Sequence, residues 1–402
     1  MEKKSNPKHK LPFLGLCLLF VYFLVSCESR ENLRVAIIDD QSETISQAPD
    51  GATTPTAANG SPTPQPQIIG DFAVAPAIIH TLPASTPLVE HSVLPTSTPL
   101  PGGEDPLADL SIEVLASRAY GRDAGTLTIE SVLESPVGFV RTLISYPSDG
   151  LKIFGFMNIP AGEGPFPVVI FIHGWVASYK YETLDYSVRY ADDLTRRGFI
   201  VIHPNLRGYP PSDNGPDYFE TGKAIDILNL VAIVQRDAGK TGLLLQADPD
   251  AIAIWGHSTG GGIAIRVVTV NQPSATDPGP AVKAAILYAP MSGDESKNAY
   301  YTFYTFSGQT RWNYEITVPP EDLIPISPMY YYDRIEAAVQ IHHGELDSLI
   351  PVDWSRETCA QMKDAGVTVE CYDYRTQTHN FCCDSYRWML DRLVSFMDIY
   401  LP

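Results

Sequence analysis

The stretch DAIAIWGHSTGGGIA, at residues 250–264, decides the fold. Residues 251–255 form a short apolar, β-branched run that predicts a buried strand, and the apolar residues after the glycines predict a buried helix. Between them lies the pattern G-x-S-x-G, centred on Ser258. Glycines two residues to either side of the serine remove the clashes that a sharp strand-to-helix turn would cause. The pattern predicts an exposed, nucleophilic hydroxyl, and the alternative is a glycine-rich turn with an incidental serine.

A nucleophilic serine needs hydrogen-bond donors for the oxyanion that forms when it attacks a carbonyl group. The helix that starts after Ser258 points its first backbone N–H groups, that of Thr259 among them, at this position. A second donor is expected after the strand predicted at 168–172, where Gly174 permits a close approach and the N–H of Trp175 follows. Packing is the alternative role for the Trp175 ring.

The serine also needs a base and an acid. His379 lies in the irregular segment TQTHNF between the last predicted strand and the last predicted helix, from which it can reach Ser258. Asp347 lies in a loop after the preceding strand, where its carboxylate can accept the second ring N–H of His379. Glu345 and Asp373 are the rival acids. Structural roles, or orientations away from the serine, are expected for the other histidines of this region: His173, His203, His257, His342 and His343.

The charge of the chain limits its partners. The 402 residues carry a formal net charge of −19. Binding to nucleic acid requires clustered Lys and Arg that neutralise phosphates, so we expect no nucleic-acid partner. A solvated acidic surface accounts for the charge.

The N-terminus predicts export. A basic segment with Lys3, Lys4, Lys8 and Lys10 precedes an apolar run at 11–25. This run is shorter than the roughly 20 residues that span a bilayer. It leads into the sequence LVSC, which resembles a bacterial lipoprotein signal whose cysteine, here Cys27, receives the lipid. We expect an exported protein anchored to the extracytoplasmic side of a membrane, and a plain signal peptide or a short uncleaved anchor is the alternative.

Composition divides the rest of the chain. Between residues 41 and 106 it shifts to Pro, Thr, Ser, Ala and Gly. Such a segment buries too little apolar surface to offset the entropy lost on ordering. We therefore predict a lipoprotein signal peptide at 1–27, a disordered linker at 28–105 and a folded domain at 106–402.

The folded domain is predicted to be an α/β protein: a mostly parallel central sheet, helices on both faces, and antiparallel strands at the N-terminal edge. Short turns link the first three strands, which favours antiparallel pairing. Those strands are predicted at 126–133, 137–146 and 151–159, and the later ones at 168–172, 199–202, 251–255, 283–288, 338–342 and 367–374. Helices are predicted at 107–120, 184–197, 221–236, 259–270, 353–365 and 384–400.

Six stretches resemble one known family: DGLKIFGF (149–156), FIHGW (171–175), PNLRG (204–208), DPDAIAIWGHSTGG (248–261), SPM (327–329) and HGELDSLIP (343–351). With them, residues 140–402 resemble the catalytic domain of prolyl oligopeptidase family serine peptidases, close to acylaminoacyl-peptidase and dienelactone-hydrolase relatives. The resemblance implies an α/β-hydrolase fold, whose order of serine, acid and histidine this chain matches. It implies that Ser258 is the nucleophile, that Asp347 orients the catalytic histidine, and that His379 is the acid and base. The backbone N–H groups named above then stabilise the oxyanion.

Departures from the family pattern leave the substrate open. Peptidases of this family usually carry a β-propeller that screens substrates, for which residues 28–139 are too few. The glycine common before the histidine is Thr378 here, and the usual second glycine after His173 and Gly174 is Trp175. We predict a serine hydrolase of small molecules or short peptides, with a peptidase or amidase first and a carboxylesterase or dienelactone-hydrolase-like esterase as the alternative. A non-catalytic surface-binding lipoprotein ranks third.

Four cysteines follow Cys27 and lie near His379 in sequence: Cys359, Cys371, Cys382 and Cys383. In an exported chain they allow disulfides, with three complete pairings. We predict that at least one bridge joins the His379 loop to the helix at 353–365. The chain has no C-x-x-C pair with a matching histidine set, so we expect neither zinc nor another cofactor. An aromatic insert at 291–332 is expected either to cap the site with an acyl pocket or to form a packed surface subdomain.

Overall fold

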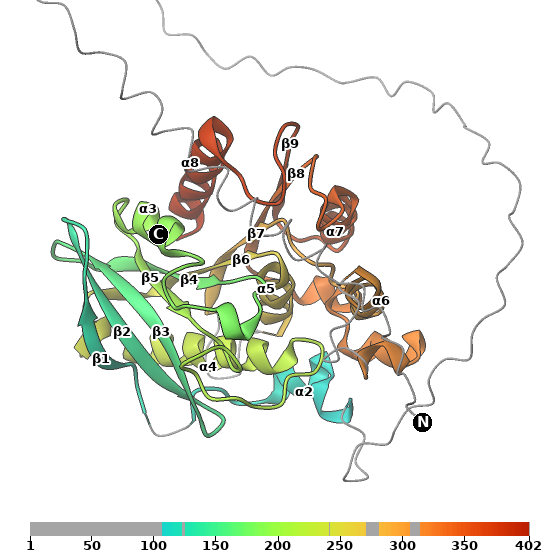
Figure 1. Cartoon of the computed structure of the whole chain (residues 1–402), viewed down its shortest axis with the longest axis horizontal. Coiled ribbons are helices and arrows are strands. Elements are labelled where there is room, and N and C mark those ends of the chain that lie inside the picture. The colour runs from blue at the N-terminus through green and yellow to red at the C-terminus, as the bar shows by residue number, and fades with distance from the viewer. Residues whose placement is uncertain (1–106, 123–124, 241, 271–280, 306–313, 402) are drawn as a thin grey trace, which may run out of the picture. The chain divides into compact units, whose positions relative to one another are not determined.

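A nine-stranded sheet forms the centre of the computed structural model, which describes residues 107–122, 125–240, 242–270, 281–305 and 314–401. The strand order across the sheet is β1-β2-β3-β5-β4-β6-β7-β8-β9, and Figure 1 shows helices on both sides of it. The expected signal peptide with Cys27 and the linker at 28–105 lie outside the described residues. Within the described ranges, no helix combines the length and apolar character needed to cross a membrane.

Antiparallel pairing is confined to one edge of the sheet, as predicted. The strands paired there are β1 (Thr128–Leu133), β2 (Phe139–Ser148), β3 (Leu151–Pro160) and β5 (Ile200–Pro204). The β2–β3 hairpin closes through Asp149 and Gly150, whose φ angles are 52° and 78°. Aspartate and glycine tolerate this left-handed conformation, which two-residue hairpin loops favour because it matches the twist of the strands.

The rest of the sheet is parallel. Alongside β5 it contains β4 (Phe166–Ile172), β6 (Ala247–His257), β7 (Val282–Tyr288), β8 (Ala338–Gly344) and β9 (Val369–Tyr374). The carboxyl ends of parallel strands meet at one edge, and ligands of such sheets bind there. The loops after β4, β6, β8 and β9 therefore share that edge, and they carry the residues predicted to do chemistry.

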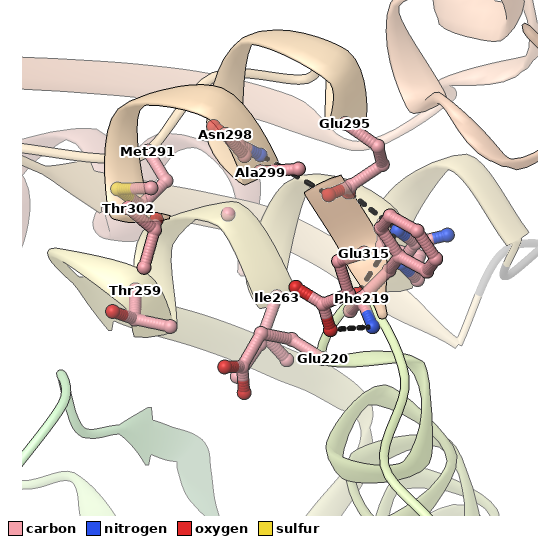
Figure 2. Close-up of a pocket in the computed structure, with 12 residues that line it drawn as sticks. Phe219, Glu220, Thr259, Ile263, Met291, Glu295, Asn298, Ala299, Thr302 and Glu315 are labelled. Carbon is pink, nitrogen blue, oxygen red and sulfur yellow. Dashed lines mark hydrogen bonds and ion pairs between the residues drawn. The ribbon is translucent and has the colours of Figure 1, made fainter. Parts of the chain in front are cut away.

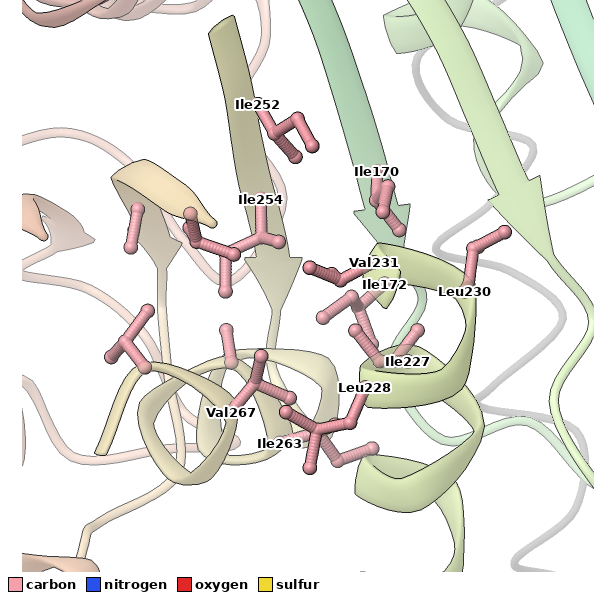
Figure 3. Close-up of a cluster of buried hydrophobic side chains, with 14 of the residues drawn as sticks. Ile170, Ile172, Ile227, Leu228, Leu230, Val231, Ile252, Ile254, Ile263 and Val267 are labelled. Carbon is pink, nitrogen blue, oxygen red and sulfur yellow. The ribbon is translucent and has the colours of Figure 1, made fainter. Parts of the chain in front are cut away.

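Two helical layers cover the sheet. The helices on one face are α2 (Ile112–Ser117), α4 (Thr221–Asp237), α5 (Thr259–Val270) and α7 (Val352–Asp364), and those on the other are α3 (Val188–Thr195) and α8 (Cys383–Tyr400). Alternate strand residues feed the two cores, so that Ile170 and Ile172 face α4 and α5 while Phe171 faces α3. Figure 3 shows the branched side chains of β4 and β6 meeting those of α4 and α5. Each such side chain contributes about 1.5–3 kcal/mol when fully buried.

Two predicted helices are shorter than expected. The segment predicted as a helix at 107–120 forms a 3-10 turn, η2 (Ala108–Leu110), followed by α2. Ser111 interrupts it, because its backbone is extended and its hydroxyl accepts a hydrogen bond from the N–H of Val114 as the cap of α2. The helix expected from residue 184 begins only at Val188, and the Ser187 hydroxyl before it contacts Nδ1 of His203 at 2.6 Å.

The remaining described elements are short. Between β7 and β8 they are α6 (Glu295–Thr305), η6 (Glu315–Thr317), η7 (Pro320–Ile326) and η8 (Pro328–Arg334), and elsewhere η3 (Ser178–Lys180) and η4 (Gly242–Leu244). The described part of the aromatic insert predicted at 291–332 thus consists of α6 and 3-10 segments. Residues 306–313 of the insert lie outside the described ranges.

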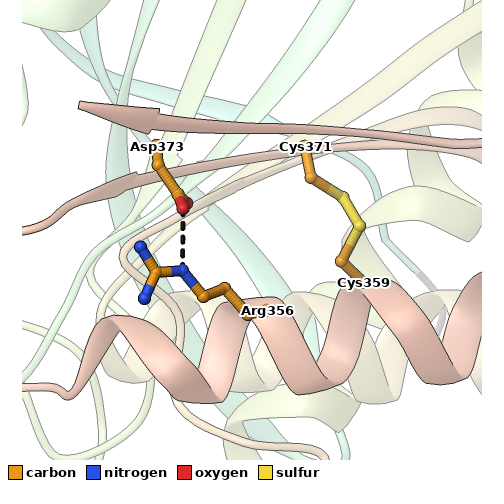
Figure 4. Close-up of a disulfide and its surroundings, with 4 residues drawn as sticks. All are labelled: Arg356, Cys359, Cys371 and Asp373. Atoms are coloured by element: carbon orange, nitrogen blue, oxygen red, sulfur yellow. Dashed lines mark hydrogen bonds and ion pairs between the residues drawn. A yellow bond between two sulfur atoms is a disulfide. The ribbon is translucent and has the colours of Figure 1, made fainter. Parts of the chain in front are cut away.

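A disulfide joins Cys359 of α7 to Cys371 of β9 (Figure 4), with Cα atoms 6.4 Å apart. The prediction that a bridge joins this helix to the His379 loop is wrong about the loop. The partner of Cys359 is Cys371 in β9, the strand that packs directly on α7. The Arg356–Asp373 ion pair links the same two elements at 2.8 Å. Cys382 and Cys383, which are nearer to His379, have sulfur atoms 3.0 Å apart at the start of α8.

Replacing both Cys359 and Cys371 with serine is expected to lower the free energy of unfolding by about 3 kcal/mol, because the bridge closes a loop with a sequence separation of 12 in the unfolded chain. Urea unfolding followed by circular dichroism measures this change. The matched control replaces Cys382 and Cys383 with serine and leaves the free energy nearly unchanged. Equal stability of the first variant and the unmodified protein would contradict the prediction.

Candidate active site

Ser258 lies on the sharp turn that the sequence predicts. Strand β6 ends at His257, helix α5 begins at Thr259, and the serine between them has a φ of 59°. A Cβ atom added to Gly256 would lie 2.2 Å from the Gly260 carbonyl oxygen, so only glycine permits this crossing of the backbone. The Ser258 N–H donates to the Tyr288 carbonyl at 2.9 Å. The turn is therefore fixed by its backbone, which leaves the serine side chain partly exposed at the sheet edge.

Asp347 and His379 meet above the same edge. Nδ1 of His379 is 2.7 Å from Oδ2 of Asp347, and the Asp347 side chain is completely buried. Its other oxygen, Oδ1, accepts the N–H groups of Leu349 and Ile350 at 2.8 and 3.0 Å. Burial alone raises the pKa of the Asp347 carboxyl, but hydrogen bonds from His343 and His379 outweigh burial and hold the pKa well below its usual range. The carboxylate is therefore ionised and can stabilise a positive charge on the His379 ring.

His257 connects this pair to the serine turn. Its Nε2 lies 3.2 Å from the His379 carbonyl oxygen, and the two rings have centroids 4.8 Å apart. Burial holds the pKa of His257 well below its usual range, so the ring is neutral. A carbonyl only accepts, so Nε2 carries the proton and Nδ1 accepts from the Tyr186 hydroxyl at 2.6 Å. The residue before the serine thus holds the backbone of His379.

The last contact of a Ser-His-Asp arrangement is not formed. Among the described residues, the His379 ring bonds Asp347 and its carbonyl bonds His257, and no hydrogen bond joins the ring to the Ser258 hydroxyl. Such bonds are often long in substrate-free sites and shorten when the substrate binds. The structure brings the acid and the imidazole into contact and ties the imidazole to the residue beside the serine, and the catalytic roles of the three residues remain predictions.

The loop after β4 lies against the serine. A Cβ atom added to Gly174 would be 2.9 Å from Cβ of Ser258 and 2.3 Å from the Tyr186 hydroxyl oxygen. The absence of a side chain at Gly174 therefore lets the backbone that leads into Trp175 approach the nucleophile. Thr259 is the first residue of α5, where backbone N–H groups have no partner within the helix. That the N–H groups of Trp175 and Thr259 bind an oxyanion stays a prediction.

The rival acids face elsewhere. Asp373 and Glu345 both pair with Arg356 at the surface, at 2.8 and 3.5 Å. Hydrogen bonds within the core also occupy three of the histidines expected to have structural roles. Their partners are Asn205 and Gly174 for His173, Ser187 and Tyr181 for His203, and Gln340 and Tyr374 for His342.

Sequence reasoning missed two contributors to the site. Tyr186 carries no local signal, since it precedes α3 and meets His257 only through the fold. His343 was expected to have a structural role, yet its Nε2 lies 2.9 Å from Oδ2 of Asp347. The spacing of four residues between His343 and Asp347 was the available signal, because the first ends β8 and the second lies in the loop that turns back over the strand end.

A small cavity of about 40 Å³ lies beside the serine turn. Figure 2 shows Thr259 and Ile263 of α5 facing Met291, Asn298, Ala299 and Thr302 across it, with Glu220 below. The insert at 291–332 supplies about half of the residues that line this cavity, but none of its described aromatic side chains is among them. Tyr300 and Tyr304 are exposed, and Tyr301 packs on Trp354. Phe219, outside the insert, is the aromatic residue of the lining.

Charged groups form the inner wall of this cavity. Arg266 and Glu295 are an ion pair. Glu315 accepts the N–H of Phe219 at 2.7 Å, and burial raises its pKa to about 8. The wall therefore presents a protonated carboxyl group beside a closed ion pair at neutral pH. Among the described residues, no group of three or more His, Cys, Asp or Glu side chains is arranged to hold a metal ion.

Two family profiles match parts of the chain. One is described as an alpha/beta hydrolase fold and matches residues 221–383, and the other is described as chlorophyllase and matches residues 144–296. The first spans the elements from α4 to the start of α8, which include all three residues of the predicted triad.

Three curated proteins are similar to the chain. The uncharacterized peptidase YtmA of Bacillus subtilis (strain 168) is 24% identical over 270 residues, which cover 65% of this chain and 95% of YtmA. The uncharacterized peptidase YuxL of the same organism is 22% identical, with 58% of this chain and 34% of YuxL covered. Lysophosphatidylserine lipase ABHD12 of Danio rerio is 24% identical, and the match covers 51% of this chain and 54% of the lipase. The chain thus spans about a third of YuxL and half of the lipase.

Solved structures show the same fold. The acetyl xylan esterase of Paenibacillus sp. R4 aligns with a TM-score of 0.53 at 16% identity, over 72% of this chain and 92% of that one. Acetyl xylan esterase 1 of Thermoanaerobacterium sp. JW/SL YS485 aligns with a TM-score of 0.51 at 16% identity, and the alignment covers 71% of this chain and 92% of that one. The sheet, the serine turn and these likenesses define an α/β-hydrolase, which confirms the predicted fold class. The proteins that the chain resembles include proteins named as peptidases and proteins named as esterases.

Proposed function

We propose that the protein hydrolyses an acyl bond through a covalent acyl-enzyme on Ser258. The observation that carries the proposal is the hydrogen bond between His379 and the buried Asp347, at the sheet edge where Ser258 projects. Nε2 of His379 takes the proton of the Ser258 hydroxyl while the Ser258 oxygen attacks the carbonyl carbon of the substrate. Asp347 stabilises the imidazolium, and the N–H groups of Trp175 and Thr259 stabilise the oxyanion.

The reaction consists of two half-reactions, in which Ser258 first receives the acyl group and then loses it to water. The His379 imidazolium gives its proton to the leaving oxygen or nitrogen, which departs as an alcohol or amine and leaves the acyl group on Ser258. A water molecule then gives a proton to the imidazole and attacks the acyl carbonyl. Return of the proton to the Ser258 oxygen releases the carboxylic acid and restores the site.

The first substrate class that we propose is peptide or amide bonds of small molecules or short peptides, by a prolyl-oligopeptidase-like enzyme. YtmA, named as a peptidase, supports it, because the match covers 95% of that relative and leaves little room for a β-propeller there. The second class is carboxylic esters. The acetyl xylan esterases that share the fold support this class.

Replacing Ser258 with alanine is expected to abolish turnover, by roughly a millionfold in kcat, and to abolish labelling by a fluorophosphonate. Alanine has no hydroxyl group, so neither the acyl-enzyme nor the phosphonyl adduct can form. The control is Ser145→Ala, which removes a buried hydroxyl on β2 that donates to Glu130 and leaves labelling of Ser258 intact. Turnover and labelling that persist in Ser258→Ala would remove the assignment, and an unlabelled wild-type protein would favour a non-catalytic binding role.

A substrate panel distinguishes the two classes. With aminoacyl p-nitroanilides and p-nitrophenyl esters of increasing acyl length, a peptidase turns over the anilides with kcat/KM comparable to that for the esters. An esterase that uses the small cavity cleaves acetyl and propionyl esters, fails on longer chains and leaves the anilides intact. We expect the protein to cleave the anilides. If it cleaves the esters and leaves the anilides intact, carboxylic esters replace amide bonds as the proposed substrates.

We also propose that the protein is exported and anchored through a lipid on Cys27. The basic segment, the apolar run of 15 residues and the small residues before the cysteine support the proposal. The Cys359–Cys371 disulfide suits an oxidising compartment outside the cytoplasm. Metabolic labelling with a radioactive fatty acid is expected to mark the full chain and to be lost in Cys27→Ser. Equal labelling of the two proteins, or none of either, would contradict the anchor.

A further inference from the structure

We propose that His343 is a positioning residue that holds Asp347 for catalysis through a hydrogen bond donated by its Nε2–H. This inference rests on the proposed function of the Asp347–His379 pair. Nε2 of His343 is 2.9 Å from Oδ2 of Asp347, the same oxygen that lies 2.7 Å from Nδ1 of His379. One carboxylate oxygen therefore receives hydrogen bonds from two imidazole rings, one on β8 and one in the loop before α8.

The neighbours of His343 fix where its proton lies. Nε2 faces the Asp347 oxygen and, at 3.0 Å, the Ile350 carbonyl oxygen. Both groups accept and neither donates, so Nε2 carries a proton. Nδ1 lies 2.6 Å from the Ser355 hydroxyl of α7, which can donate to it. Ser355 thus holds the ring in the orientation that directs the Nε2–H at Asp347.

Burial makes this contact consequential. The side chains of His343 and Asp347 are both completely buried, so no water replaces a missing donor. The titratable groups that face Asp347 are His343 from β8, His379 from the loop before α8, His257 from β6 and Tyr301 from α6. Only the first two donate to its carboxylate in the described part of the chain. Loss of the His343 donor leaves Oδ2 to His379 alone.

Two consequences follow for the reaction. The carboxylate loses one of the contacts that orient it, and a small misplacement of a catalytic group costs up to about 100-fold in rate. Oδ2 also becomes a stronger acceptor for the His379 ring, so the imidazolium form persists to higher pH. The acid limb of the kcat/KM profile should therefore move to higher pH, which a loss of folded protein alone would not cause.

His342 offers a matched control. It is the neighbouring residue of the same strand and is equally buried, but its ring bonds Gln340 and Tyr374 on the opposite face of the sheet. Leucine at either position removes an imidazole from the core, and only the change at 343 removes a donor to Asp347. Glutamine at 343 restores an N–H near the position of Nε2.

The experiment compares H343L, H343Q and H342L with the wild-type protein in kcat/KM across pH. We expect H343L to lower kcat/KM by about 100-fold and to move the acid limb upward. H343Q should recover most of the activity and return the acid limb of the pH profile to its wild-type position. H342L should leave the acid limb at its wild-type position. An unshifted limb in H343L, or equal shifts in H343L and H342L, would overturn the inference.

A second measurement does not depend on catalysis. Selective isotope labelling of histidine and NMR of the wild-type protein, assigned with H343Q, reports the tautomer of His343. We expect a proton on Nε2, and a ring protonated on Nδ1 alone would overturn the inference. If the wild-type protein neither turns over substrate nor reacts with a fluorophosphonate, the proposed function fails, while the tautomer still decides how His343 contacts Asp347.

Discussion

The buried carboxylate of Asp347 is the group on which the arrangement of the site depends. A charge with no exposure must receive hydrogen bonds from the protein, since water cannot reach it. Four donors do so: two backbone N–H groups of its own loop, the His343 ring and the His379 ring. These donors belong to β8, to the loop before α7 and to the loop before α8. Satisfying one charge thus fixes three segments relative to one another and leaves His379 with its second ring nitrogen for the serine.

The serine reaches this assembly through backbone constraints. Strand β6 is separated from β8 by β7, so the turn after β6 and the loop after β8 share an edge without being adjacent. His257, which ends β6, instead donates to the carbonyl of His379 in the loop after β9, and His379 in turn contacts Asp347 of the loop after β8. A side chain at Gly256 would clash with the backbone of Gly260, and one at Gly260 would clash with the carbonyl oxygens of Ile172 and His173. The two glycines therefore let α5 start directly after the strand. Positions that carry no reactive group therefore determine where the reactive group lies.

Features with a local physical cause could be predicted from the sequence. Alternation of strand and helix patterns predicted the mixed sheet, and the glycines around Ser258 predicted the turn, because both depend on neighbours in the chain. The order of Ser258, Asp347 and His379 identified the pair that the structure brings into contact. Features set by distant contacts were missed. The partner of Cys359 depended on which strand packs on α7. The helix expected at 107–120 was too long for a local reason, because the Ser111 cap starts a new helix within it.

The two adjacent histidines of β8 show why those features escape a local reading. Side chains of a strand alternate between the faces of the sheet, so His342 enters the layer of α8 and His343 the layer of α7. In sequence the two are equivalent: each is a histidine near the end of a buried strand. In the fold, one meets Gln340 and Tyr374, while the other meets Ser355 and the Asp347 carboxylate. What a buried histidine can do is therefore decided by the acceptors and donors that the sheet edge and the neighbouring helix place around its two nitrogens.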